Sequence, residues 1–202
     1  DDRLIPIILD QTTYNHLRKI LYDMQLNQYI CRHLFIIPEL WHVLKSALTS
    51  LMKGPSSPLF LLSQLFLKYW MKSNFEITEQ RMMMRHSSYN NMILMSQYFH
   101  AAWKLVKEYI YATYGEHIKK NKDLQMLVYM FNFCIPTILN FLGNTSKSPE
   151  IFLSALHDLI HVLSISATNY CPILLKYIAD LFGLSVREEK IWIVFMMNIG
   201  KK

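Results

Sequence analysis

YNNMILMSQYFHAAWKLVKEYIYATYG, residues 89–115, repeats its apolar side chains at every third or fourth position. That spacing places them on one face of an α-helix. Glycine at position 115 favours a helix end, because it accepts the left-handed backbone conformation that is common just past one. We therefore predict a helix over residues 89–114. Its inward stripe is expected to comprise Met92, Ser96, Phe99, Trp103, Val106 and Ile110.

The same spacing recurs along almost the whole chain, and no segment sustains the alternating pattern of a strand. The sequence therefore predicts an all-α protein of about eight helices joined in antiparallel hairpins. An α-solenoid and an irregular helical bundle both fit this pattern. The expected helices cover approximately residues 12–34, 38–52, 57–72, a short segment ending near 85, 89–114, 123–142, 149–165, 169–183 and 186–199.

The composition favours one well-packed domain. The 202 residues are 52% hydrophobic and 18% charged, which is enough apolar material for a large core. There are only five glycines and seven prolines, whereas many-stranded folds need turn residues at short intervals. We expect residues 1–202 to form a single all-helical domain. Since the chain begins with Asp1 rather than methionine, we also expect it to be part of a larger protein.

The cysteines indicate a reducing compartment. Cys31, Cys134 and Cys171 lie far apart in apolar surroundings, and none forms a CxxC motif. They are typical of reduced, buried thiols in an intracellular protein, cytoplasmic or nuclear. The first residues are acidic and their apolar run is too short for a signal peptide.

One segment, residues 124–143, is apolar enough to be tested as a membrane span. It carries Gln125, Asn132, Pro136 and Asn140, and such polar groups are unfavourable in hydrocarbon. The sequence therefore favours a buried core helix here, bent near Pro136, and no membrane partner.

A resemblance to a known family comes from CPILLKYIADLFGLSVREEKIWIVFMMNI, residues 171–199. Pro172 lies early in a first helix, and a tight turn leads to Val186 and Arg187 at the start of a second one. The stripe of the first helix is Leu174, Tyr177, Ile178 and Leu181. This pattern resembles one HEAT or armadillo-type repeat. The resemblance implies a surface for protein interaction rather than a reaction.

Two histidines in SALHDLIHVL, residues 154–163, approach the helix motif of zinc hydrolases. His157 and His161 are four residues apart, Asp158 follows the first, and Glu188 or Glu189 is a candidate third ligand. Helix geometry, however, turns both histidines away from the apolar face. Three interpretations remain: a solvated or partner-facing polar surface, a weak metal site, and a metalloenzyme. We expect the first of these, with no resident metal.

Other motifs for catalysis are absent from the sequence. It contains no Gly-rich phosphate loop and no GxSxG nucleophile motif. We therefore expect a non-enzymatic protein without a cofactor.

The last predicted helix carries the strongest hint of a partner. Its core, IWIVFMMNI at residues 191–199, is apolar almost all round. Such a helix either lies at the centre of the fold or exposes Trp192, Phe195 and Met196 to a partner, to a further repeat or to a second copy. We take these three side chains as candidate partner-binding residues.

Two functions follow as hypotheses. The first is an interaction scaffold that presents a helix-lined surface to a protein partner or to further repeats of the same chain. The alternative is a nucleic-acid-binding helical scaffold, since the net charge is +6. Its phosphate contacts would come from the basic residues Arg81, Arg85, Lys119, Lys120 and Lys122.

Overall fold

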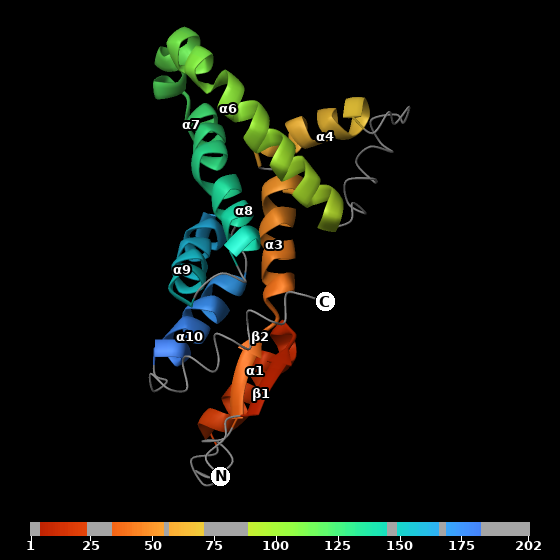
Figure 1. Cartoon of the computed structure of the whole chain (residues 1–202), viewed down its shortest axis with the longest axis vertical. Coiled ribbons are helices and arrows are strands. Elements are labelled where there is room, and N and C mark those ends of the chain that lie inside the picture. Colours follow the sequence, from red (N-terminus) through yellow and green to blue (C-terminus); the bar gives the residue numbers. More distant parts are fainter. Residues whose placement is uncertain are drawn as a thin grey trace. The chain divides into compact units, whose positions relative to one another are not determined.

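The computed structural model describes residues 5–23, 34–54, 57–70, 89–144, 149–165 and 169–182 (Figure 1). Helices dominate these ranges, which confirms the predicted all-α class. The chain divides into two compact units, one formed by residues 1–46 with 144–202 and the other by residues 47–143. The predicted helix over residues 186–199, and with it most of the HEAT-like segment, lies outside the described residues.

The first unit begins with a strand–helix–strand segment. It comprises β1 (Ile5–Leu9), α1 (Gln11–Asp23) and β2 (Leu34–Pro38). The strands pair in parallel, with Ile5 opposite Leu34 and Leu9 opposite Pro38. The same unit contains α9 (Pro149–Ile165) and α10 (Tyr170–Phe182), which pack against each other as the predicted hairpin.

Neither strand was predicted. Strand β1 precedes the helix predicted over residues 12–34, and β2 begins at Leu34, where that helix was expected to end. The helix is present as α1 to Asp23, and residues 24–33 lie outside the described ranges. Both strands are only five residues long and almost entirely apolar. A run of this length shows no clear period, so a buried strand cannot be told from a buried helical turn by pattern alone.

The core of the first unit lies between the sheet and its helices. Helix α1 and helix α10 contact β2, and α1 also contacts α10 (Figure 1). The rings of Phe35 and Tyr177 pack at 6.2 Å between centroids. Tyr14, Ile37 and Leu174 are buried in the same core. Burial of these side chains supplies the main stabilisation of this unit.

The second unit is built around a long helical hairpin. Its elements are α4 (Leu59–Trp70), α6 (Tyr89–Lys120), α7 (Lys122–Tyr129), the π-helical turn η1 (Met130–Cys134) and α8 (Ile135–Asn144). Helix α3 (Leu40–Lys53) connects the two units in sequence. In Figure 1, α6 leads to α7, which turns back beside it, and contacts between α6 and both α7 and η1 close the hairpin.

Helix α6 is longer than predicted, because Gly115 does not end it. The helix continues to Lys120, and Asn121 begins the next one. A glycine inside a helix is destabilising by about 1 kcal/mol relative to alanine. Burial of Ile118, one turn later, offsets this penalty. The prediction of a helix end at Gly115 is therefore wrong.

The π-helical turn explains how a proline is accepted within a long helical run. Pro136 lacks an N–H, and its ring would clash with the carbonyl four residues earlier in a regular α-helix. Immediately before it, the N–H of Ile135 bonds the carbonyl of Met130, five residues back. The wider turn relieves the proline clash without ending the helix. The predicted helix over residues 123–142, with a distortion near Pro136, is confirmed in this form.

The turn of the hairpin depends on Asn121. Its side-chain oxygen accepts hydrogen bonds from the N–H groups of Asp123 at 2.9 Å and Leu124 at 3.1 Å. We expect Asn121→Ala to lower the free energy of unfolding by about 1 kcal/mol, because two N-terminal N–H groups of α7 lose their acceptor. Urea denaturation measures this change. Asn121→Asp keeps the acceptor and should retain wild-type stability; equal losses in both variants would contradict the capping role.

Candidate functional site

An apolar groove runs along the hairpin of the second unit. It has a volume of about 520 Å³ and lies between α6 and the α7–η1 run. We call it the α6 groove. Helix α6 contributes Tyr98, Phe99, Ala102, Trp103, Val106, Ile110, Tyr114 and Ile118. The opposite wall consists of Leu124, Leu127, Val128 and Phe131, and Leu62 of α4 joins them.

Aromatic rings form the floor of this groove. The indole of Trp103 stacks on Phe131, with centroids 5.1 Å apart and planes 11° from parallel. Phe99 meets Phe131 edge-on at 6.1 Å. All three side chains are buried, whereas Val106 on the wall is 43% exposed. The predicted inward stripe therefore holds for Phe99 and Trp103, and Val106 faces an open groove instead of the core.

A short polar chain crosses the hairpin beside the floor. The indole N–H of Trp103 donates to Oδ1 of Asn132 at 2.7 Å. The amide nitrogen of Asn132 in turn donates to the hydroxyl of Tyr111 at 2.8 Å. A buried indole N–H needs such a partner. Asn132 is thus the polar group that allows Trp103 to be buried, and it fixes the register of α6 against η1.

The groove has basic surroundings. Lys107 follows Trp103 by four residues and precedes Ile110 by three, so it lies at the border of the groove-facing stripe. The end of the groove is formed by Ile118 and Leu124, and the connection between them carries Lys119, Lys120 and Lys122, all exposed. Lys119 pairs with Glu116 at 2.7 Å. Residues 47–143 hold ten lysines and arginines against five acidic residues, so most of the chain's net charge of +6 belongs to this unit.

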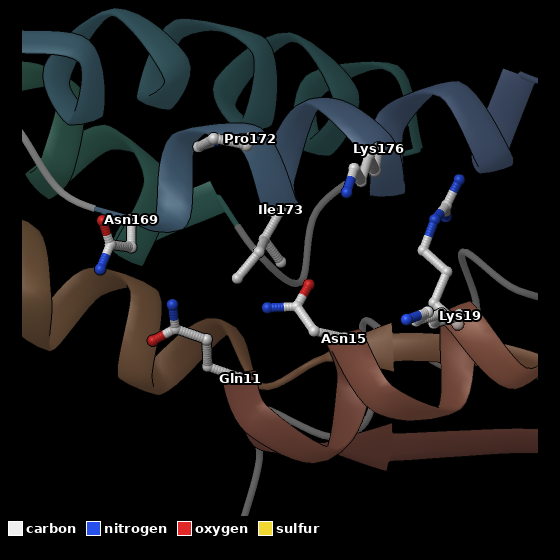
Figure 2. Close-up of a pocket in the computed structure, with 8 residues that line it drawn as sticks. Gln11, Asn15, Lys19, Asn169, Pro172, Ile173 and Lys176 are labelled. Carbon is white, nitrogen blue, oxygen red and sulfur yellow. The ribbon is translucent and has the colours of Figure 1, made fainter.

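A second, polar pocket lies in the first unit. It has a volume of about 780 Å³ and opens between α1 and α10, and we call it the α1–α10 pocket (Figure 2). Its lining comprises three amides, three cationic side chains and two aliphatic ones: Gln11, Asn15, Asn169, Arg18, Lys19, Lys176, Pro172 and Ile173. None of the lining side chains is acidic.

Two carboxylates follow the paired strands next to this pocket. Asp10 comes directly after β1 and Glu39 directly after β2. Oδ1 of Asp10 accepts the N–H of Thr13 at 2.9 Å and thereby caps α1, and this bond lowers the pKa of Asp10. Glu39 lies 2.6 Å from Nδ1 of His42. Burial and the charges of Glu39 and Asp10 raise the pKa of Tyr170.

These carboxylates have structural partners. Among the residues that the structure describes, no three histidine, cysteine, aspartate or glutamate side chains are grouped so as to hold a metal ion. Asp10 caps a helix and Glu39 contacts a histidine on the next one. Both acids therefore act first as anchors for the helices that begin at this edge of the sheet.

An ion pair holds the far end of the α1–α10 pocket. Arg18 of α1 binds the carboxylate of Asp180 on α10. The buried hydroxyls of Tyr14 and Tyr177 lie in the same interface, and Arg18 is near enough to the Tyr14 hydroxyl to oppose the rise in its pKa. Burial, reinforced by the charge of Asp180, raises the pKa of Tyr14 to about 12. Both hydroxyls stay protonated at neutral pH.

The structure turns the predicted histidine pair outward. His157 and His161 are exposed on α9, and their ring centroids are 5.7 Å apart. Nδ1 of His157 lies 3.9 Å from Asp158, whereas Glu188 and Glu189 lie outside the described residues. The helix geometry expected for the two histidines is confirmed.

Some of the other predicted site residues lie near the α6 groove, and the rest lie outside the described residues. Lys119, Lys120 and Lys122 are exposed around the end of α6, where they adjoin the α6 groove. Arg81 and Arg85 lie outside the described residues, and so do the partner-binding candidates Trp192, Phe195 and Met196. For the cysteines, Cys134 is buried, Cys171 is half-buried and Cys31 lies outside the described ranges.

Sequence reasoning missed both the α6 groove and the α1–α10 pocket. A signal for the groove did exist: α6 carries apolar residues on two faces, and Val106 and Tyr114, which line the groove, are 43% and 47% exposed. One helix packed on one neighbour should bury a single stripe. No comparable signal existed for the pocket, because residues 11–19 and 169–176 come together only through the tertiary fold.

One described segment, Lys122–Gly143, is long and apolar enough to cross a bilayer by length and composition. In its most apolar window 33% of the residues are buried within the protein. Core helices of water-soluble proteins meet the same criteria. The segment is therefore weak evidence for a membrane location.

The polar chain beside the groove predicts a stability effect. Asn132→Ala should lower the free energy of unfolding by about 1–2 kcal/mol, because the buried indole N–H of Trp103 loses its acceptor. Asn132→Asp keeps an acceptor and should lose less. Urea denaturation measures both, with Gln97→Ala on the exposed side of α6 as the neutral control. A loss in Gln97→Ala equal to that in Asn132→Ala would contradict the role of the bond.

The exposed histidines predict that the fold is independent of zinc. EDTA should leave the melting temperature unchanged, because two exposed imidazoles do not provide the four ligands of a structural zinc site. Metal analysis of the purified protein should find substoichiometric zinc. Stoichiometric zinc that survives dialysis, and that the double variant H157A/H161A loses, would contradict this expectation.

Comparisons with known proteins identify no family. No protein-family model matches the sequence, and searches of curated proteins and of solved structures found no match. The HEAT or armadillo resemblance of residues 171–199 stays a prediction.

Proposed function

We propose that this chain is a non-enzymatic protein-interaction module and that its α6 groove binds the apolar face of a partner's amphipathic helix. One observation carries the proposal: a continuous apolar groove open to solvent on a unit with a net positive charge. Soluble proteins rarely leave large apolar patches uncovered without a partner.

The dimensions of the groove support a helical partner. Its α6 wall extends from Tyr98 to Ile118. Twenty steps of 1.5 Å separate these two residues, which gives a wall of about 30 Å, the length of a helix of about 20 residues. Helices that bind in grooves insert anchors spaced three, four and seven residues apart. The buried rings of Trp103 and Phe131 offer a rigid floor for such anchors.

The charges around the groove support an acidic partner. Lys120 and Lys122 are exposed at one end, whereas Lys107 at the wall and Lys119 already contact Glu108 and Glu116. A partner helix with glutamate or aspartate on its polar face would meet these ammonium groups at the rim. Such rim pairs favour encounter and orientation more than affinity. We therefore expect the apolar contacts to determine affinity and the lysines to determine partner choice.

Two free thiols support an intracellular location. Cys134 is a buried free thiol in the second unit, and Cys171 is a free thiol in the first. Burial raises the pKa of Cys134 to about 12. A thiol so protected remains reduced and unreactive at neutral pH. Unpaired cysteines of this kind are typical of reducing compartments.

Nucleic-acid binding by the same lysines is the second candidate function. Lys120 and Lys122 are exposed and accessible to phosphate groups. Lys119 is already paired with Glu116, however, and Asp123 follows Lys122 directly. These acids reduce the local positive charge. The apolar groove therefore favours a protein partner over a nucleic acid.

The test uses a fluorescein-labelled peptide of three heptads, with leucine at the apolar positions and glutamate elsewhere. Binding to the full chain is followed by fluorescence anisotropy. Val106→Glu should weaken binding by about tenfold or more, since it puts a charge into the groove; one decade corresponds to about 1.4 kcal/mol. Leu105→Glu adds the same charge at the neighbouring residue, which is exposed outside the groove lining, and should leave binding nearly unchanged.

Two further results define the outcome. The same peptide with lysine in place of glutamate should bind more weakly, and added salt should reduce this difference. Equal losses in both glutamate variants, or no saturable binding of the acidic peptide, would contradict the proposal. Binding of a fluorescein-labelled DNA duplex that falls steeply with salt would support the second candidate instead.

A further inference from the structure

The α1–α10 pocket has a chemistry that the proposed interaction function does not use. Lys19 and Lys176 reach it from facing helices, and neither has an ion-pair or hydrogen-bond partner among the described residues. The amides of Gln11, Asn15 and Asn169 are likewise without a described partner. The pocket therefore holds unused donors and acceptors beside unneutralised positive charge.

The two kinds of side chain lie at opposite ends. Gln11, Asn15 and Lys19 follow one another at four-residue intervals along one face of α1. Figure 2 shows Gln11 and Asn169 together at one end and Lys19 and Lys176 at the other. The pocket thus has an amide end and a lysine end. A ligand that spans it needs hydrogen-bonding groups at one end and a negative charge at the other.

The lysine end is suited to a phosphate group. Its third cation, Arg18, is neutralised by Asp180, and this pair ties α1 to α10 and fixes the distance across the pocket. Lys19 and Lys176 remain without an acidic partner among the residues that the structure describes. Ammonium and phosphate form strong charge-assisted hydrogen bonds. The opposite end disfavours an anion, because Asp10 already occupies the N-terminus of α1 with its own carboxylate.

The amide end and the middle are suited to a nucleobase and its sugar. Each amide both donates and accepts hydrogen bonds, as do the edges of the bases. Ile173 points toward the middle of the pocket but is 2% exposed (Figure 2), so the exposed Pro172 is the aliphatic lining residue that offers a surface to a base. A volume of about 780 Å³ lies in the range of small-molecule sites.

The position of the pocket in the fold agrees with this chemistry. Helix α1 lies in the connection between two parallel strands, and only Asp10 separates the end of β1 from Gln11, where the helix begins. Ligands of proteins with parallel sheets bind outside the carboxyl ends of the strands. The amide end of the pocket lies at this edge.

We propose that the α1–α10 pocket binds a nucleotide, with the phosphate between Lys19 and Lys176 and the base at the amides. The nucleotide is either free or part of an oligonucleotide strand, and the chemistry of recognition is the same in both cases. A phosphorylated peptide or an anionic membrane would use the lysine end alone and leave the amide end unoccupied.

The test titrates the full chain with a fluorescent adenosine monophosphate and with a fluorescein-labelled ten-nucleotide single strand. Both are followed by anisotropy, and inorganic phosphate serves as competitor. The variant K19Q/K176Q should weaken binding by at least about tenfold, because two charge-assisted contacts are lost. K45Q/K104Q removes two exposed lysines outside the pocket and should change binding less than about twofold.

The amides have their own test, at Asn15 in the middle of the pocket (Figure 2). Asn15→Ala should weaken the nucleotide while leaving competition by inorganic phosphate unchanged. The methyl resonance of Ile173 should shift on titration, which reports occupancy of the pocket itself. All substituted side chains are exposed, and far-UV circular dichroism should confirm that each variant keeps the fold.

The possible results separate cleanly. Binding of the mononucleotide, of the strand or of both supports the proposal and identifies the source of the nucleotide. No saturable binding of either probe overturns it. Inorganic phosphate that competes as well as adenosine monophosphate overturns it too, since the amides would then recognise nothing. Equal weakening by the control pair also overturns it. Peptide binding to the α6 groove should be unchanged in K19Q/K176Q, so the two proposals fail independently.

Discussion

The indole of Trp103 imposes the constraint on which the second unit depends. Its ring must be buried, and its N–H must still find an acceptor. Asn132, from the opposite arm of the hairpin, satisfies the second demand at 2.7 Å, and Phe131 satisfies the first by stacking. These neighbouring residues can serve Trp103 together only in one register of the two arms. The register in turn determines which side chains of α6 face the groove, so a single aromatic residue couples stability to the proposed binding surface.

The first unit rests on a different principle. Parallel pairing of β1 and β2 requires a long connection between them, and α1 forms the described part of it. Helix α10 comes from far along the chain and packs beside α1, where Arg18 and Asp180 hold the two helices together. The pocket is therefore a product of topology. The ion pair and the buried tyrosine rings already hold the two helices together. The polar side chains of the pocket are therefore not needed for this packing and can contact a ligand.

Sequence reasoning reached the helical class and most helices because their apolar residues keep a long, regular period. It found the α9–α10 hairpin, and it predicted the outward position of His157 and His161 from helix geometry alone. It failed where local signals competed with tertiary packing. Gly115 signals an end, but packing of the next turn extends the helix. The strands were missed because five apolar residues do not define a period.

The α6 groove and the α1–α10 pocket were harder to predict than the fold. The residues that α1 gives to the α1–α10 pocket stand 150 or more positions before those at 169–176, and nothing local relates the two groups. The groove residues resembled an ordinary buried stripe, since Val106 and Ile110 have the same spacing as Phe99 and Trp103. Which α6 side chains are buried and which line the open groove depends on where the α7–η1 run packs against α6. The number of lysines predicted the net positive charge correctly. It did not show which lysines carry a free charge, because Lys119 is paired with Glu116.

The π-helical turn affects which helix faces point toward the groove and which toward the core. One additional residue per turn rotates everything beyond it by about 100° around the helix axis. The face that α7 presents to the groove is thus out of phase with the face that α8 presents through Ile138 and Phe141, both buried. A substitution on the groove-facing side of α7 is therefore separated from the core-facing side of α8. The bulge divides one continuous helical run into two parts with different packing faces.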